Sequence, residues 1–105
     1  KELSNSVFEE CCNLNRVECS DIDTIGEFAF SECYSLLSIK LPNSLKRIKS
    51  CAFNECTSLC KMHIPFSVET VGDDAFCGCE QLNDLDKKDI VVRFGANAIE
   101  TWLDV

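Results

Sequence analysis

Several residue types are scarce in this 105-residue chain. It contains two prolines, four glycines and one tryptophan, and so little Pro and Gly argues against a disordered or low-complexity chain. Hydrophobic residues make up 46% of the chain and charged residues 27%, as in an ordinary globular domain. No apolar run approaches the roughly 20 residues that a membrane-spanning helix needs.

Basic residues are also in deficit. The chain has 10 Lys and Arg against 18 Asp and Glu, which gives a formal net charge of -8. Such a charge repels a phosphate backbone or an anionic membrane surface. We therefore expect no nucleic-acid partner.

A repeat of 23 residues is the strongest pattern in the sequence. An apolar residue followed four positions later by Ala recurs without gaps, beginning at Ile25, Ile48, Val71 and Phe94. In the first three copies the Ala precedes a Phe, a Cys follows three residues after that Phe, and a Leu three residues after the Cys. An earlier copy, with Cys11 as its cysteine, is one residue short of the period. Such self-similarity is typical of repeat architectures.

Each Leu of the repeat leads into a short alternation of apolar residues, which predicts a strand. We predict parallel strands over 16–19, 38–41, 61–64 and 84–86. One 23-residue unit cannot bury its own apolar side chains, so successive units must stack with strands roughly 4.8 Å apart. Phe30, Phe53 and Phe76 should then form a stacked aromatic spine.

Glycines recur after the first apolar residue of the unit. We expect Gly26, Gly72 and Gly95 to supply a positive φ after a strand. Lys49 interrupts this column, so one turn must manage without glycine.

The repeat unit reads L-x-x-I-x-L-P-x-S-L-x-x-I-G-x-x-A-F-x-x-C-x-x, and it resembles the BspA-like (Treponema pallidum-type) leucine-rich repeat family over nearly the whole chain. The resemblance implies an α/β repeat solenoid, mostly β and right-handed, with about four repeats and short parallel strands on its concave face. We assign one leucine-rich repeat domain over 1–105, with repeats at approximately 3–24, 25–47, 48–70, 71–93 and a partial one at 94–105.

The strand pattern also predicts a binding surface. If the leucines and every second strand residue point inward, the residues between them face outward on the concave side. This surface is mixed in sign and includes an apolar element, which suits a protein partner. The predicted protein-binding residues are Arg16, Glu18, Leu37, Ser38, Lys40, Lys61, His63, Asp84 and Asp86.

Nine cysteines require an explanation. Cys11, Cys33, Cys56 and Cys79 share one repeat position, where a thiol can act as a weak donor to backbone carbonyls. Stacked neighbours about 4.8 Å apart are farther from each other than the roughly 3.8 Å between Cβ atoms in a disulfide. We expect these thiols to be buried and reduced, which favours a reducing compartment.

Catalysis and metal binding have weaker support in the sequence. Cys77-x-Cys79 and Cys11-Cys12 are the nearest approach to zinc-ligand spacing. His63 is the only histidine and lies on a predicted strand, so no base is placed beside a cysteine nucleophile. We expect no enzyme activity, metal or cofactor.

The family resemblance implies a non-catalytic protein–protein interaction module, adhesin-like or scaffold-like, whose partner is a host or matrix protein or an intracellular protein. The alternative is an intracellular regulator of a protein phosphatase, acting through the concave face or through Lys88–Phe94. That segment loosely resembles a basic-Val-x-Phe docking peptide. The register of Phe94 instead predicts a core residue of the last repeat.

Localisation and assembly are further expectations. Unpaired thiols favour the cytoplasm or a cytoplasm-facing membrane periphery. The chain start lacks an apolar signal stretch, and the cell surface is the alternative if a signal lies outside Lys1–Val105. Open solenoid ends expose strand edges, so self-association of the chain through an end is also expected as an option. Lys87 stands where the repeat asks for an apolar residue and would partly cap one end.

Overall fold

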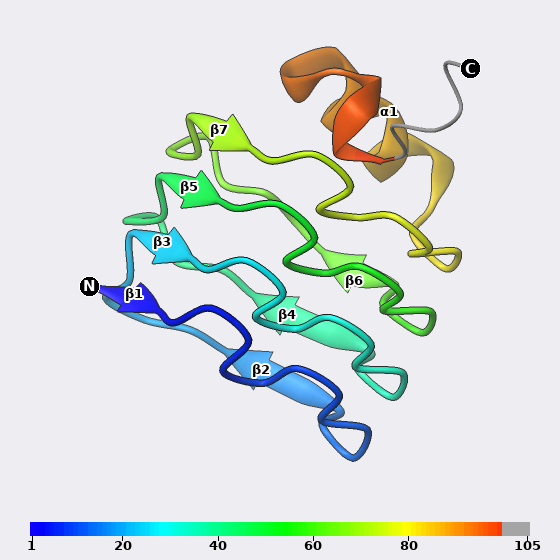
Figure 1. Cartoon of the computed structure of the whole chain (residues 1–105). Coiled ribbons are helices and arrows are strands. Elements are labelled where there is room, and N and C mark those ends of the chain that lie inside the picture. Colours follow the sequence, from blue (N-terminus) through cyan, green and yellow to red (C-terminus); the bar gives the residue numbers. More distant parts are fainter. Residues whose placement is uncertain (100–105) are drawn as a thin grey trace.

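The computed structural model describes residues 1–99, and these form a coil of stacked turns (Figure 1). Each of the first three turns contributes one short strand to each of two parallel sheets, and the fourth turn contributes a strand to only one of them. One sheet contains β1 (Glu2–Leu3), β3 (Thr24–Ile25), β5 (Arg47–Ile48) and β7 (Thr70–Val71), and the other contains β2 (Arg16–Glu18), β4 (Ser38–Lys40) and β6 (Lys61–Met62). The helix α1 (Asp84–Phe94) and the 3₁₀ helix η1 (Ala96–Ala98) follow the last strand.

The register of the sheets follows the sequence repeat. Arg16 is opposite Ser38, and Ser38 is opposite Lys61. The strands predicted at 16–19, 38–41 and 61–64 begin at the predicted residues and end one or two residues early. The predicted leucine-rich-repeat solenoid with short parallel strands is therefore confirmed.

Phenylalanines form the spine of the core. The rings of Phe30 and Phe53 lie 5.3 Å apart, as do those of Phe53 and Phe76, and Phe8 extends the stack at 5.4 Å from Phe30. Backbone hydrogen bonds also join these turns. The N–H of each spine phenylalanine donates to the carbonyl of the repeat Ala in the next turn. The last of these bonds joins Phe76 to Ala98 at 2.9 Å. The repeat register thus continues past α1.

The conformation of the turns corrects the glycine prediction. Gly26 and Gly72 do not have positive φ; Gly95 does, but it ends helix α1 rather than a strand. Gly72 is required by close approach instead, since a Cβ there would lie 2.4 Å from the backbone nitrogen of Ser50. Most of the left-handed positions form two repeating columns, and non-glycine residues occupy all but one place in these columns. The columns are Ser6, Phe28, Cys51 and Asp74, and Glu10, Glu32, Glu55 and Gly78.

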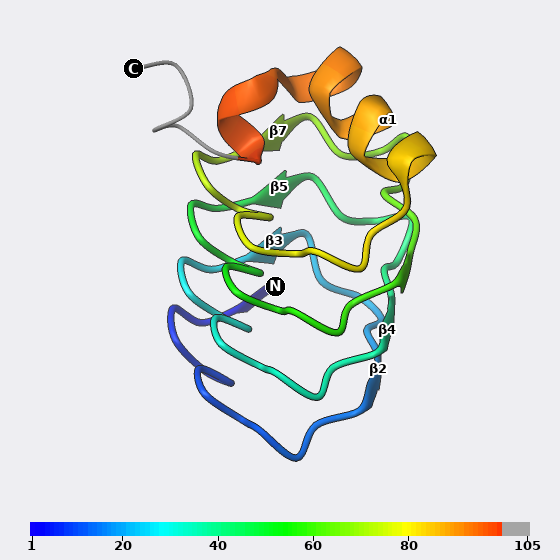
Figure 2. The same cartoon turned by 90° about the vertical axis from the view of Figure 1, so that its right-hand side faces the viewer.

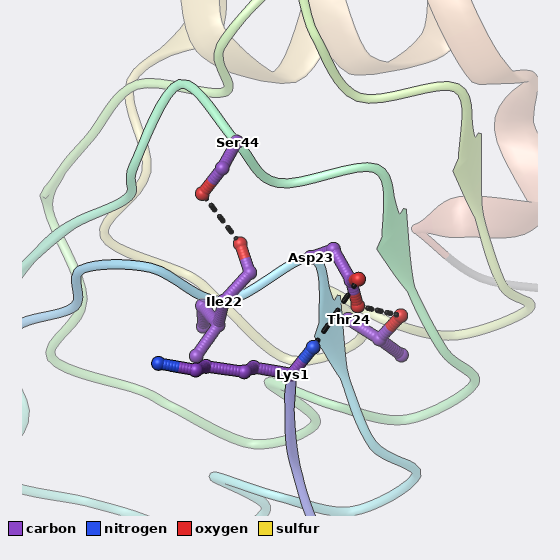
Figure 3. A network of polar contacts seen from close by, with 5 residues as sticks. All are labelled: Lys1, Ile22, Asp23, Thr24 and Ser44. Atoms are coloured by element: carbon purple, nitrogen blue, oxygen red, sulfur yellow. Dashed lines mark hydrogen bonds and ion pairs between the residues drawn. The ribbon is translucent and has the colours of Figure 1, made fainter.

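Polar contacts join successive turns beside the first sheet (Figure 3). Ser44 Oγ donates to the carbonyl of Ile22 at 2.7 Å, and the amino terminus of Lys1 contacts Asp23 at 3.3 Å. Hydrogen bonds from Thr24 and from the amino terminus hold the pKa of Asp23 below its usual range. The ion pair between the amino terminus of Lys1 and Asp23 is exposed, so it adds little to stability.

The two ends of the coil differ. At the C-terminal end α1 lies across the last turn (Figure 2), and its Ile90 is fully buried in the common core. At the N-terminal end Phe8, Cys11 and Leu14 are only half-buried, although their counterparts in the next turn are buried. Within residues 1–99, α1 therefore covers the last turn, whereas apolar residues of the first turn are partly exposed.

Candidate protein-binding face

The outward side chains of β2, β4 and β6, with Leu37 and His63 beside them, form one surface, which we call the strand face. Arg16, Ser38 and Lys61 make one row across the strands, and Glu18 and Lys40 make the second. His63 follows β6 at the repeat position of Lys40, and its side chain is exposed. Seven of the nine residues predicted to bind a partner thus lie together. They are Arg16, Glu18, Leu37, Ser38, Lys40, Lys61 and His63.

Strand alternation holds this face in place. Ile39 and Met62, between the outward residues, are only 3% and 7% exposed, and Val17 packs partly against the same core. The backbone beneath the outward side chains is therefore fixed by buried neighbours. The face can present side chains at regular spacing with little cost for ordering the backbone.

The surface of the face is hollowed by two shallow grooves. One groove is lined by Arg16, Val17 and Glu18 from β2 together with β4. The other runs between β4 and β6 and is lined by Lys61, Met62 and His63, with Pro65 at one side. The grooves share Ile39 and Lys40, so they adjoin across β4.

Charges on the face remain accessible. Lys40 Nζ lies 3.9 Å from Glu18 Oε2, and both side chains are more than three-quarters exposed. A pair so open to water contributes little to stability. It can therefore exchange for contacts with a partner at little energetic cost.

Two predicted face residues are placed elsewhere. Asp84 and Asp86 lie in the first turn of α1, so the strand predicted over 84–86 is wrong. Asn83 caps the helix, since its Oδ1 accepts from the Asp86 N–H at 2.8 Å, and carboxylates stabilise a helix N-terminus. Leu85, expected to point inward, is 80% exposed.

The segment 88–94 belongs to the same helix, so it is not the extended docking peptide of the phosphatase alternative. Ile90 is buried, and Phe94 packs partly against the core at the end of the helix. The prediction that Phe94 is a core residue is therefore confirmed in part: its side chain packs against the core, but it lies at the end of a helix and not in a strand. An extended conformation of this segment would require α1 to unfold.

Arg93 fastens α1 to the turn that follows β6. Its guanidinium donates to the carbonyls of Ile64 at 2.9 Å and Pro65 at 2.8 Å, and contacts Asp89 at 3.2 Å. The same group lies over the ring of Phe66, 5.1 Å from its centroid. The planar, forked guanidinium matches two adjacent carbonyls better than the single ammonium group of a lysine would.

We expect Arg93→Ala to lower the free energy of unfolding by about 2 kcal/mol, because hydrogen bonds from a charged donor contribute about 1.5 to 3 kcal/mol. Arg93→Lys should recover little of this loss. Urea denaturation measures the effect, and hydrogen exchange should show α1 opening first. Lys88→Ala, an exposed change on the same helix, is the control. Equal stabilities of the two alanine variants would show that Arg93 does not hold the cap.

One exposed aromatic beside the strand face was missed by the sequence reasoning. Phe66 is 86% exposed, and the His63 ring meets it edge-on with centroids 6.3 Å apart. Phe66 directly follows Pro65, where the repeat pattern demands no apolar residue. That departure from the pattern was the available signal.

The four cysteines at the shared repeat position, Cys11, Cys33, Cys56 and Cys79, form a ladder, and the predicted burial is met at three of them but is wrong for Cys11. Cys33, Cys56 and Cys79 are buried, whereas Cys11 is half-buried in the first turn. The thiols of Cys33 and Cys56 donate to the carbonyls of Phe8 and Phe30 in the preceding turn, at 3.1 and 3.0 Å. Burial raises the pKa of Cys56 to about 12 and that of Cys79 well above its usual value. These thiols are therefore protonated structural donors rather than nucleophiles.

We expect iodoacetamide at about pH 8 to modify exposed Cys12 and to spare Cys33, Cys56 and Cys79 in the native protein. The pKa of Cys56 is about 12 in the folded protein, against an ordinary value of 9.0. The protonated thiol therefore makes its full contribution to the stability of the fold at pH values below 9.0. The contribution is lost as the pH rises towards the folded value. Mass spectrometry of the alkylated peptides checks the order, and fast native labelling of Cys56 would contradict the ladder.

The structure does not bring His63 and the cysteines together as a catalytic pair or a metal site within residues 1–99. Within residues 1–99 no hydrogen bond joins His63 to a cysteine, and the Cys60 thiol donates instead to the Leu37 carbonyl at 3.6 Å. In the same range the only grouping with metal-ligand spacing consists of three carboxylates on the turn side, those of Glu9, Glu10 and Glu32.

The stacked turns, the paired parallel sheets and the outward strand face define the chain as a leucine-rich-repeat module. The BspA type leucine rich repeat region matches residues 1–102 in six copies. The chain therefore belongs to the BspA-type leucine-rich repeat family, as its repeat unit indicated. Repeats of this family are typically non-catalytic.

Solved structures agree with this assignment. A leucine-rich repeat protein of T. pallidum is 36% identical, with a TM-score of 0.75 over 77% of this chain and 38% of that one. A leucine-rich repeat protein from Bacteroides ovatus is 30% identical, with a TM-score of 0.80 over 95% of this chain and 26% of that one. A leucine rich cell surface protein from Faecalibacterium prausnitzii is 32% identical, with a TM-score of 0.73 over 76% and 21%.

This chain spans well under half the length of each of these three proteins. A comparison with curated proteins gives no match. Neither helix in residues 1–99 has the length and apolar character needed to cross a bilayer.

Proposed function

We propose that this chain is a non-catalytic module that binds another protein through the strand face, as part of an adhesin-like or scaffold-like protein. The observation that carries the proposal is the row of outward side chains formed by exposed Arg16, half-buried Ser38 and exposed Lys61, aligned over buried Ile39 and Met62. A rigid and regularly spaced array of this kind is what repeat proteins use for recognition.

The opposite sheet is a weaker candidate. Its strands have two residues each, and Thr24 in its central row is only 5% exposed. Asp23 beside that row is already engaged by Thr24 and the amino terminus. The strand face differs from this flank in that Leu37 and His63 add exposed apolar and aromatic surface to it.

For localisation we propose a reducing compartment, either the cytoplasm or a cytoplasm-facing membrane periphery. Nine free thiols support this proposal, because such thiols persist where glutathione keeps them reduced. The cell surface is the alternative, and the F. prausnitzii relative, a leucine rich cell surface protein, supports it. Recovery of far fewer than nine free thiols from freshly purified, denatured protein would favour the surface.

Self-association through a solenoid end stays a further proposal. Within residues 1–99, Phe8, Cys11 and Leu14 of the first turn are half-buried, whereas α1 covers the last turn. A contact between two N-terminal ends pairs like with like and closes as a dimer rather than growing into a filament.

Hydrogen exchange tests the proposed function. The chain is used to capture a protein from host-cell or matrix extract, and the exchange of the purified complex is compared with that of the free chain. Protection confined to the segments carrying β2, β4 and β6 is the expected result. Protection confined to the turns that carry Phe28 and Cys51, with unchanged exchange on the strand face, would overturn the proposal.

A further inference from the structure

We propose that the strand face receives an extended, acidic segment of its protein partner, with carboxylates held by Arg16, Lys40 and Lys61. This inference rests on the proposed function and specifies the chemistry of the partner. The shape, the charge and the spacing of the face carry it.

The charge of the face is opposite to that of the chain. The whole chain has a formal net charge of -8, yet the strands of this face present three cations against the single carboxylate of Glu18. Asp84 and Asp86, which would have balanced these cations, lie in α1. Glu18 is already paired with Lys40, whereas Arg16 and Lys61 form no ion pair within residues 1–99.

The spacing of the cations fits an extended chain. Neighbouring parallel strands are about 4.8 Å apart and alternate residues along a strand about 6.6 Å apart. Arg16 and Lys61, in the row of Ser38, are therefore about 9.6 Å apart, and Lys40 lies about 8 Å from each of them. Alternate side chains of an extended peptide are also separated by about 6.6 Å. The flexible stems of Arg and Lys can take up the difference.

The grooves favour a peptide over a uniform polyanion. They are shallow and adjoin across β4, and their floor contains apolar Val17, Ile39 and Met62 between the charged residues. A peptide can alternate carboxylates with apolar side chains that cover this floor. A sulfated polysaccharide or nucleic acid cannot, and it would also meet Glu18 and the net negative charge of the chain.

The inference can be tested with the chain and synthetic peptides by fluorescence anisotropy. The probe is a labelled peptide of alternating Glu and Leu or Ser residues, long enough to cross three strands. A matched peptide carries Gln in place of every Glu, and heparin serves as a polyanion without a peptide backbone. We expect the Glu peptide to bind roughly tenfold more tightly than the Gln peptide, and Lys61→Glu to remove most of that difference. Lys46→Glu, an equal charge change at an exposed residue next to β5, should have little effect.

The possible results separate the two proposals. Equal binding of the Glu and Gln peptides, with hydrogen-exchange protection of β2, β4 and β6, would overturn the acidic partner and leave the strand face as the binding surface. Tighter binding of heparin than of the Glu peptide would also overturn it, in favour of a polyanion. Failure of the Glu peptide to bind counts against it too, while protection of the strand face by a captured protein would still support the proposed function.

Discussion

Replacing Phe53 with alanine should lower the free energy of unfolding by roughly 3 to 5 kcal/mol, the usual cost of truncating a buried phenylalanine. The ring of Phe53 is fully buried and lies 5.3 Å from the ring of Phe30 on one side and from that of Phe76 on the other. The cavity would therefore interrupt the spine at its centre. A domain of this size has about 5 to 15 kcal/mol of stability in total, so the loss is large.

Urea denaturation followed by circular dichroism measures this effect. Phe66→Ala is the matched control, because Phe66 is 86% exposed and its ring meets Arg93 of α1 and His63 of the strand face rather than the core. It should cost no more than about 1 kcal/mol, the value of an exposed cation–π contact. Similar losses in the two variants would mean that the turns do not share one continuous core.

Reversing the charges of Lys40 and Lys61 together should weaken partner capture by roughly a hundredfold, if each reversed charge pair is worth about a factor of ten. Both side chains are exposed on adjacent strands, so the melting temperature should hardly change. The effect on binding therefore separates from any effect on folding. Phe53→Ala should behave in the opposite way and lose binding only because the coil unfolds.

The matched control reverses Lys46 and Lys49 instead. These lysines are exposed beside and after β5, on the other sheet, and the double reversal changes the net charge by the same amount. Capture measured by surface plasmon resonance should be retained in this variant. Equal losses in both double variants would point to long-range electrostatic attraction rather than to a site on the strand face.

The sequence predicted the stacked part of the fold because stacking demands repetition. Ile39 and Met62 must occupy the same place in successive turns, and the three phenylalanines must align, so the period alone places β2, β4 and β6. The surface residues of those strands follow from alternation. That is why most of the candidate site could be read from spacing.

The C-terminal cap could not be read in the same way. Extending the period past Leu82 predicts a strand over 84–86, but this segment forms the start of helix α1. A helix satisfies its own backbone, and local signals for one were present in Asn83, Asp84 and Asp86 at the start and Gly95 at the end. Those local signals prevailed over the repeat.

The left-handed backbone conformation of the turns could not be predicted from the sequence, for another reason. Phe28, Cys51 and Asp74 share a left-handed position with φ near 58°, although their side chains have nothing in common. The strain at such a residue costs about 1 to 2 kcal/mol, and hydrogen bonds between turns, such as that from Cys51 N–H to the Asp73 carbonyl at 3.1 Å, offset it. Because the neighbouring turns impose this conformation, it does not require a particular residue type, and the sequence carries no signal for it.

The most direct test of binding through the strand face is photo-cross-linking from two positions of similar exposure. Leu37 is 43% exposed at the edge of β4, and Phe28 is 39% exposed in the turn after β3. A benzophenone side chain is placed at one or the other, and the partner-bound chain is irradiated. The strand-face account predicts a cross-linked partner from position 37 and almost none from position 28. Strong cross-linking from position 28 with none from position 37 would contradict it.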